Sequence, residues 1–283
     1  MTAVDGLLLV DKPGGVTSHD VVASVRRTLG MRKVGHAGTL DPMATGLLVL
    51  GVGRATRLLR FLGELPKTYA GTFVLGVETT TLDADGDVTT TSVVDVTDEA
   101  LASAMSALLG GSLQRPPAYS AVKVGGRKLY EAARAGEELI AQPRPIRVDR
   151  FDVVERRGAS VDFVAVVSTG TYVRVLAADV GASLGCGAHL AALRRTAIGS
   201  FSVRDASSLG SLGEILPLEA GVAHLPQVVL LEDEARVARH GSILGPAGVE
   251  GPYAVVDPRG SLIGVYRDDG PKGRPEVILA TEA

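Results

Sequence analysis

Apolar residues in the first third of the chain occur in short runs that are separated by Gly and Pro. The runs at 6–10 and 47–52 are rich in strand-forming residues and predict buried strands. Between them, Thr17 precedes a segment that places Val21 and Val22 on one face, and this predicts a helix that ends before Gly30. The N-terminal part is therefore expected to mix strands with helices.

Further along the chain, polar and apolar residues alternate, and the spacing predicts strands over 67–76, 146–154 and 161–167. An amphipathic helix is expected over 97–109, where Thr97 can act as the N-cap and two acidic residues follow in the first turn. The middle of the chain therefore adds at least three strands and a helix.

Residues 169–174 are predicted to be extended, so that Tyr172 and Arg174 point to the same side. A helix is predicted over 175–184. A turn and a short helix that ends in two arginines are predicted over 185–195.

Two segments differ in character from their surroundings. Residues 116–145 combine prolines, paired glycines, tyrosines and cationic side chains, a pattern that fits either an exposed arm that grips RNA or a mobile surface loop. From about residue 225 the pattern changes to short strands and one helix, which predicts a small β-rich unit. The expected domains are therefore 1–224, which includes the insertion at 116–145, and 225–283.

Composition limits the classes of protein that need to be considered. The chain has 283 residues and a single cysteine, Cys186, which excludes an internal disulfide framework and a multi-cysteine zinc site. The first residues lack a basic leader region, and no apolar run approaches the roughly 18–20 residues needed to cross a bilayer. A cytoplasmic protein that is neither secreted nor inserted in a membrane is expected.

The net charge of −3 conceals an uneven distribution. Residues 1–60 carry eight Lys and Arg against four Asp and Glu, and residues 116–204 carry thirteen against eight. The remaining two blocks are acidic. If the two basic blocks meet in the fold, they form a positive face suited to nucleic acid.

The richest candidate chemistry lies in Gly35-His-Ala-Gly-Thr-Leu-Asp-Pro42. This stretch places an acid, Asp41, five residues after an imidazole, His36, and neither end is expected to lie in a regular helix or strand. Pro42 biases Asp41 towards extended or turn geometry, and Asp-Pro can also begin a helix. Asp41 is therefore predicted at a sharp junction, where it acts either as a cap or as a functional acid.

A second acidic segment, Asp83-Ala-Asp-Gly-Asp87, resembles the start of a calcium loop. The twelfth position would be Val94, which cannot supply a carboxylate, so a solvated acidic turn is expected. No metal-ligand cluster or phosphate loop is recognised. The candidate site gathers the following residues: Lys12, His36, Asp41, Tyr69, Tyr172, Arg174, Arg194 and Arg195.

Six segments in order across residues 7–203 resemble the TruB family, the bacterial tRNA pseudouridine-55 synthases. They are Leu9-Val-Asp-Lys-Pro13 with Gly15-Val-Thr-Ser18, Gly35–Gly46, Lys67-Thr-Tyr69, Asp83-Ala-Asp-Gly86, Arg115-Pro-Pro-Ala-Tyr-Ser-Ala-Val-Lys123, and Gly170-Thr-Tyr-Val-Arg174 with Gly185-Cys-Gly-Ala-His189 and Leu193-Arg-Arg195.

The resemblance implies an α+β fold, namely the pseudouridine synthase fold. Its central mixed sheet is largely antiparallel and flanked by helices. The RNA-gripping insertion corresponds to 116–145, and the C-terminal domain is expected to be PUA-like.

The resemblance also implies residue roles. Asp41 is the catalytic carboxylate, which must be ionised, and Arg174 pairs with it and lowers its pKa. Tyr69 stacks on the flipped uracil, and Tyr172 lines the pocket.

Three further residues are implied to contact the substrate. His36 helps to hold the tRNA loop once the target base has left its stack, Leu193 packs against the base, and Lys12 lies nearby. The expected enzyme is a monomer that acts on the tRNA T-arm. It uses no cofactor, metal or guide RNA.

The implied reaction breaks the N1–C1′ bond of uridine, turns the uracil and joins C5 to C1′. The carboxylate attacks the sugar, attacks the base or removes a sugar proton, and all three routes remain open. The alternative functions are a pseudouridine synthase for another RNA, a tRNA-folding or tRNA-binding protein whose catalysis is secondary, and a nucleoside hydrolase.

Overall fold

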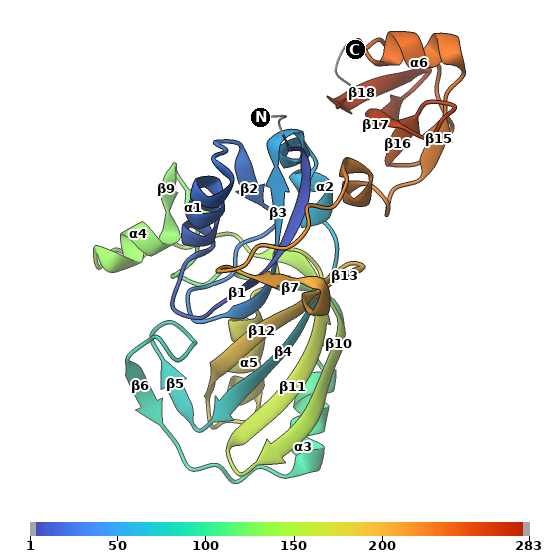
Figure 1. Cartoon of the computed structure of the whole chain (residues 1–283). Coiled ribbons are helices and arrows are strands. Elements are labelled where there is room, and N and C mark those ends of the chain that lie inside the picture. The colour runs from blue at the N-terminus through green and yellow to red at the C-terminus, as the bar shows by residue number, and fades with distance from the viewer. Residues whose placement is uncertain (1–3, 280–283) are drawn as a thin grey trace.

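The computed structural model describes residues 4–279, which form one large sheet, a separate four-stranded sheet at one end of the molecule and two small hairpins (Figure 1). The large sheet has ten strands in the order β14-β1-β3-β12-β4-β11-β10-β7, with β2 paired to β3 and β13 to β12. Among the described strands of this sheet, β1 pairs with β14 and β12 with β3 in parallel, and the other pairs are antiparallel. This mixed, largely antiparallel sheet with helices on its faces confirms the predicted α+β class.

The strands of the large sheet are β1 (Gly6–Lys12), β2 (Val34–His36), β3 (Thr45–Val52), β4 (Lys67–Leu75), β7 (Gly110–Gln114), β10 (Arg144–Arg157), β11 (Ser160–Val167), β12 (Ala188–Ile198), β13 (Phe201–Ser202) and β14 (Ser207–Ser208). Two small hairpins join β5 (Val77–Thr79) to β6 (Val88–Thr91) and β8 (Lys123–Val124) to β9 (Arg127–Lys128).

The α-helices are α1 (Ser18–Leu29), α2 (Leu59–Gly63), α3 (Asp98–Ser106), α4 (Leu129–Arg134), α5 (Val173–Ser183) and α6 (Glu232–Ala238), and short 3₁₀ helices lie at Gly53–Arg57, Val203–Asp205 and Leu218–Gly221. None of the helices within residues 4–279 is long and apolar enough to span a membrane.

Helix α1 begins and ends where the sequence predicted. The Thr17 hydroxyl accepts a hydrogen bond from the backbone of Asp20, and the Asp20 carboxylate accepts one from the Thr17 backbone, so the two residues form a capping box. Gly30 ends the helix with φ 64°, a left-handed conformation that glycine adopts at low cost. The apolar face of α1 packs on alternate residues of β1 and β3.

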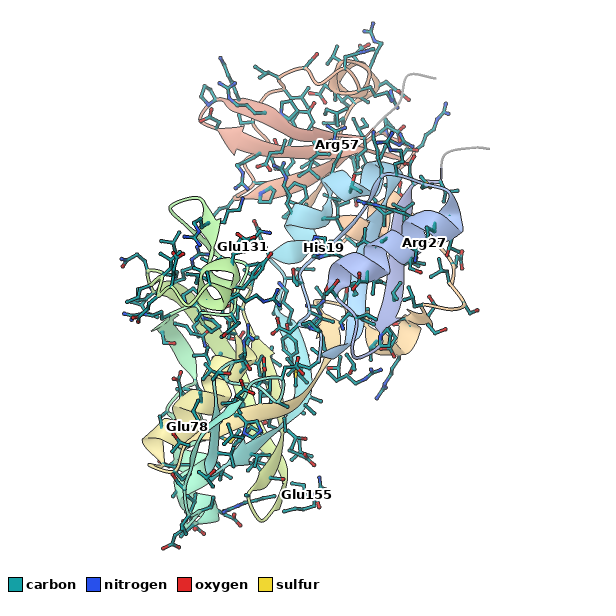
Figure 2. The ribbon with its side chains drawn as sticks, turned by 90° about the vertical axis from the view of Figure 1, so that its left-hand side faces the viewer. His19, Arg27, Arg57, Glu78, Glu131 and Glu155 are labelled. Atoms are coloured by element: carbon teal, nitrogen blue, oxygen red, sulfur yellow. The ribbon has the colours of Figure 1, made fainter. Side chains whose placement is uncertain are left out.

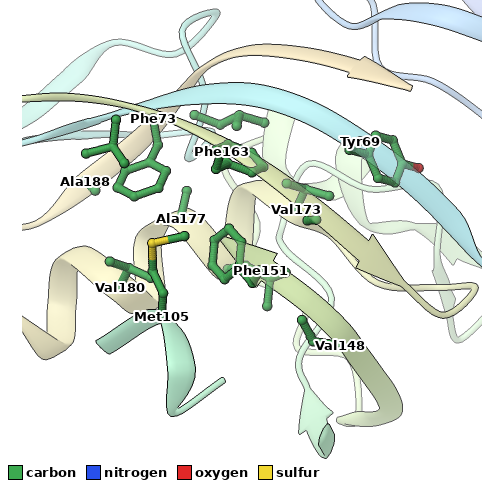
Figure 3. Close-up of a cluster of buried hydrophobic side chains, with 14 of the residues drawn as sticks. Tyr69, Phe73, Met105, Val148, Phe151, Phe163, Val173, Ala177, Val180 and Ala188 are labelled. Carbon is green, nitrogen blue, oxygen red and sulfur yellow. The ribbon is translucent and has the colours of Figure 1, made fainter. Parts of the chain in front are cut away.

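Helices α3 and α5 cover one face of the other half of the sheet (Figure 3). Phe73, Phe151 and Phe163 pack together there, with ring centroids 5.3–6.4 Å apart. Tyr69 lies at one end of this core in the figure. This core also contains Leu40 and Ala44, so it anchors the loop that carries Asp41.

The structure contradicts the prediction for residues 185–195. The turn before Ala188 is present, but in place of the short helix residues 188–198 form the central strand β12, which pairs with β3 on one side and β4 on the other. The alanines and leucines of this segment favour a helix locally, but its position between two strands overrides that preference.

The expectation that Tyr172 and Arg174 lie in an extended segment is also wrong. Helix α5 begins at Val173, two residues earlier than expected, so Arg174 is helical and Tyr172 is the N-cap. The two side chains do not share a strand face. They still meet, because the guanidinium carbon of Arg174 lies 5.9 Å from the centroid of the Tyr172 ring.

The second sheet consists of β15 (Gln227–Val229), β16 (Pro252–Val256), β17 (Leu262–Asp269) and β18 (Lys272–Ile278), in that order. Its inner face shares an apolar cluster with Leu58, Phe61 and Val222. Arg60 of α2 adds an ion pair to Glu276 at 2.7 Å. The small sheet is therefore packed against the part of the chain that follows β3.

Candidate active site

Asp41 lies in an irregular loop, residues 37–44, between β2 and β3. The expected helix start is absent. A turn follows instead, in which the Ala44 N–H donates to the Asp41 carbonyl at 3.1 Å, and Thr45 begins a strand. The segment 35–42 was expected to lie outside regular structure at both ends. At its first end this is wrong, because His36 is the last residue of β2.

A buried arginine holds the backbone of this loop. Arg195 is 1% exposed, and its guanidinium donates to the carbonyls of Gly38 at 3.0 Å, Thr39 at 3.4 Å and Leu47 at 2.8 Å. An irregular buried backbone has no strand or helix partner for its carbonyls, so these bonds replace the missing secondary structure. Arg195 therefore fixes the loop on both sides of Asp41.

Lys12 and Ser18 hold the loop from the opposite side. The fully buried Lys12 Nζ donates to the carbonyls of Pro13 at 3.0 Å, Val16 at 2.7 Å and Pro42 at 3.2 Å. The Ser18 hydroxyl accepts from the Leu40 N–H at 2.9 Å and donates to the Leu40 carbonyl at 3.1 Å. Burial lowers the pKa of Lys12, and the nearby Asp41 charge opposes that shift.

Two glycines make this loop geometry possible. Gly38 has φ 112° and Gly46 has φ 101°, conformations that residues with a Cβ adopt rarely. A Cβ on Gly46 would lie 2.3 Å from the Arg195 carbonyl oxygen. Strand β12 can therefore pair closely with the start of β3 only because residue 46 has no side chain.

Arg174 connects Asp41 to the rest of the site. Its side chain is 5% exposed, and one guanidinium nitrogen, Nη2, lies 3.7 Å from Asp41 Oδ2 and donates to the Tyr119 carbonyl at 2.6 Å. The other, Nη1, donates to Asp83 Oδ2 at 2.9 Å. Arg174 thus pairs with two carboxylates and makes its shorter contact with Asp83.

Asp83 contradicts the prediction of a solvated acidic turn, because the residue is only 3% exposed. One carboxylate oxygen accepts from the Thr81 hydroxyl and from the Asp85 N–H, and the other accepts from Arg174. The preceding residue, Leu82, has φ 64°, and its carbonyl accepts from Leu190 of β12. The sequence pattern identified this acidic turn but did not indicate that Asp83 is buried against α5.

The pKa of Asp41 also differs from the expectation that Arg174 lowers it. Loss of solvent around the carboxyl group raises the pKa, and this effect exceeds the opposing effect of Arg174. The negative charges of Asp83 and Asp85 raise the pKa further. Because Arg174 also neutralises Asp83, it cannot fully compensate the burial of Asp41.

The remaining predicted residues surround this centre at different depths. Tyr69 is buried and Leu193 partly buried, and both pack in the cluster that contains Leu40 and Ala44. Tyr172 is partly exposed, and its backbone is held by Gln114, whose side-chain oxygen accepts from Tyr172 N–H at 2.7 Å. Gln114 thus connects the end of β7 to the start of α5.

His36 is partly buried and faces α1. Burial lowers its pKa, with further lowering from the positive charges of His19 and Arg195. Its Nδ1 is buried and has no hydrogen-bond partner among residues 4–279. The ring of His19 lies edge-on to it, with centroids 5.5 Å apart and an interplanar angle of 85°.

Many cationic side chains of the second basic block, residues 116–204, form ion pairs with acidic side chains close in the sequence. Arg147, Arg150 and Arg157 each form an ion pair with an acidic residue within five positions. In the insertion, Arg127 pairs with Glu137 at 2.6 Å. A positive face cannot therefore be inferred by adding the charges of the two blocks.

In the described part of the chain, no group of three or more His, Cys, Asp or Glu side chains is placed to hold a metal ion. The residues around Asp41 instead combine a carboxylate that is 41% exposed, a buried guanidinium and an aromatic ring. Such a site can supply an acid or nucleophile next to a flat apolar surface.

Three family models together match most of the chain. Residues 26–173 match the model described as TruB family pseudouridylate synthase (N terminal domain). Residues 174–229 match tRNA pseudouridylate synthase B C-terminal domain, and residues 225–280 match tRNA Pseudouridine synthase II, C terminal.

Similar proteins extend over nearly the whole length. The "tRNA pseudouridine synthase B" of Mycobacterium sp. (strain KMS) is 46% identical over 288 residues, covering 98% of this chain and 97% of the relative. That of Rhodococcus jostii (strain RHA1) is 47% identical over 285 residues, covering 97% and 93%.

Solved structures share the fold. A chain of "Structure of H/ACA RNP bound to a substrate RNA containing 2'-deoxyuridine" has a TM-score of 0.76 and 25% identity, covering 98% of this chain and 85% of that one. A chain of "Crystal Structure of a Cbf5-Nop10-Gar1 Complex" has a TM-score of 0.75 and 27% identity, covering 97% and 84%.

The hydrogen bonds of Arg195 predict that its substitution lowers the free energy of unfolding far more than substitution of the neighbouring Arg194. Arg195→Met removes the donor to the buried Leu47 carbonyl and to the less buried carbonyls of Gly38 and Thr39, so the free energy of unfolding falls by about 3–5 kcal/mol. Arg194→Met removes only a half-exposed ion pair to Asp11, and its cost stays below about 1 kcal/mol. Urea unfolding measures both, and equal losses would contradict the role of Arg195.

Because Arg174 pairs with both Asp83 and Asp41, removing the charge of Asp83 is predicted to change the pKa of Asp41. Asp83→Asn removes a negative charge that raises the pKa of Asp41 and a competitor for Arg174, so this pKa falls. Carboxyl ¹³C NMR of Asp41 against pH measures the change. Asp87→Asn, at an exposed position four residues away, serves as the control, and an unchanged pKa in Asp83→Asn would disprove the coupling.

Proposed function

The chain belongs to the TruB family of pseudouridylate synthases, and on that basis we propose that it converts one uridine of tRNA to pseudouridine, position 55 in the T-arm. The observation that carries the proposal is the placement of Asp41. Its carboxylate is partly exposed on a rigid loop, 3.7 Å from a buried arginine. A single carboxylate beside a cation lacks the second acid that a glycosidase needs.

The reaction is an isomerisation, so every atom of the uridine is retained except the hydrogen on C5, which exchanges with solvent. The N1–C1′ bond breaks, the uracil turns, C5 bonds to C1′, the C5 proton leaves, and N1 takes up a proton from solvent. Asp41 attacks the sugar, attacks the base or removes a sugar proton. Each of these steps requires the ionised carboxylate.

Arg174 keeps a positive charge beside Asp41 and so favours its ionised form. Because Asp83 and the Tyr119 carbonyl hold the guanidinium, Arg174 does not have to move to pair with Asp41. We assign Asp83 a positioning role, since it acts on Asp41 through Arg174. The raised pKa of Asp41 means that activity falls as the pH drops through that pKa.

The target base must leave the stack of the T-loop before Asp41 can reach it, at a cost of a few kcal/mol. Tyr69, Tyr172 and Leu193 offer aromatic and apolar surface that offsets this cost when the base stacks on it. His36, at the end of β2, helps to hold the loop that the base has left. Lys12 is fully buried, so we assign it to the backbone of the Asp41 loop rather than to the RNA.

The RNA is proposed to lie on the face seen in Figure 2, where His19 of α1, Glu131 of the insertion and Arg57 are labelled. Residues 116–145, which include α4 and the β8–β9 hairpin, would close over the T-arm. We propose residues 225–283 as a separate C-terminal domain, supported by the family match at 225–280. The protein is proposed to act in the cytoplasm as a monomer without a guide RNA.

Tritium release tests the proposed reaction. Wild-type protein, incubated without guide RNA with a tRNA transcript labelled at uracil C5, releases tritium from the T-arm uridine because C5 becomes the glycosidic carbon. Asp41→Asn lowers the rate by about 10³-fold or more, since the variant cannot form the carboxylate. Asp87→Asn leaves the rate unchanged.

No release by the wild type from tRNA would refute the proposed reaction and would favour a binding or folding role. Release from a different RNA would identify another substrate, and free uracil would indicate hydrolysis. Release by Asp41→Asn at the wild-type rate would exclude Asp41 as the catalytic acid.

Substitutions of Tyr69 test stacking on the base. Tyr69→Phe keeps the ring, so its rate stays closer to wild type, whereas Tyr69→Leu loses about 1–3 kcal/mol of stacking and is slower. The measurement is the single-turnover rate of tritium release for each variant. Equal rates for Phe and Leu would contradict stacking by Tyr69.

A further inference from the structure

His19 is a second imidazole on the proposed RNA face, and none of the roles described so far uses it. It is the second residue of α1 and is exposed, and Figure 2 shows it on the same face as Glu131 of the insertion. Its ring meets the ring of His36 edge-on at 5.5 Å. Edge-on pairs of aromatic rings are favourable because the positive edge of one faces the negative face of the other.

His36 needs a partner that fixes its ring. Its backbone is set by β2, which pairs with Leu50 of β3, but its Nδ1 has no hydrogen-bond partner within residues 4–279. Burial and the nearby positive charges lower its pKa and so favour the neutral ring. The ring interacts with the Gly38 backbone, but its Nδ1 has no partner, so packing contributes to the ring orientation and His19 supplies an edge-on contact.

The capping of α1 makes His19 a firm support. Thr17 and Asp20, on either side of it, form the capping box, and Ser18 holds Leu40 of the catalytic loop. The first turn of α1 is therefore fixed to the same loop that follows His36.

We propose that His19 is a positioning residue that orients the His36 ring and thereby strengthens the grip on the tRNA loop. The proposal rests on the function proposed above and on the role of His36 in it. His19 acts through His36, so its loss weakens tRNA binding only while the His36 ring is present. Asp41, Arg174 and the chemical step remain unchanged.

A double-mutant cycle tests this dependence with full-length protein and a tRNA transcript. His19→Ala weakens tRNA binding by about two- to tenfold, the range expected for loss of an aromatic pair. In the His36→Ala background the same substitution changes the Kd by less than about twofold. His19→Phe, which retains a ring, keeps the affinity close to wild type.

Thr28→Ala, an exposed position on the same helix, leaves the Kd unchanged and controls for general effects on α1. A wild-type Kd for His19→Ala would overturn the proposal. So would an equal loss in both backgrounds, which would mean direct contact with the RNA or a general effect on the fold. His19→Phe as weak as His19→Ala would also overturn it.

The two proposals fail in different ways. If the wild type releases no tritium from tRNA, the proposed function fails, whatever the cycle shows. If the wild type is active and the cycle shows no coupling between the two histidines, only the role of His19 fails.

Discussion

The candidate site depends on buried cations that bind backbone carbonyls. Asp41 lies in a loop without regular hydrogen-bond partners, and burying such a backbone is costly unless each polar group is satisfied. Arg195 and Lys12 meet this requirement from opposite sides, with bonds to Gly38, Thr39 and Pro42. The loop is therefore rigid without being a helix or strand, and the Asp41 carboxylate reaches solvent from a fixed position.

A second constraint is the division of one arginine between two acids. Arg174 bonds Asp83 directly and lies 3.7 Å from Asp41, so its charge is anchored before any substrate binds. Burial nevertheless raises the pKa of Asp41. The protonation of Asp41 therefore depends on the balance between loss of solvent, which raises its pKa, and the charge of Arg174, which lowers it.

Local patterns in the sequence predicted strands at 67–76 and 161–167, observed at Lys67–Leu75 and Ser160–Val167, and the limits of α1. They failed where tertiary contacts decide the outcome. The segment Ala188–Ile198 has a helical composition but completes the sheet between β3 and β4. Asp83 has the sequence of an exposed turn but is buried by α5 and β12, and the pKa of Asp41 is raised chiefly by loss of solvent around its own carboxyl group. Neither fact can be obtained from spacing along the chain.

The central claim is that the backbone bonds of Arg195 hold Asp41 in its working position. The most direct test is the single-turnover rate of isomerisation by Arg195→Met with saturating tRNA, at a temperature where the variant is folded. The account predicts a rate at least about tenfold below wild type, as expected when a catalytic group is misplaced, while Arg194→Met stays near wild type. A folded Arg195→Met variant that reacts at the wild-type rate would contradict the claim.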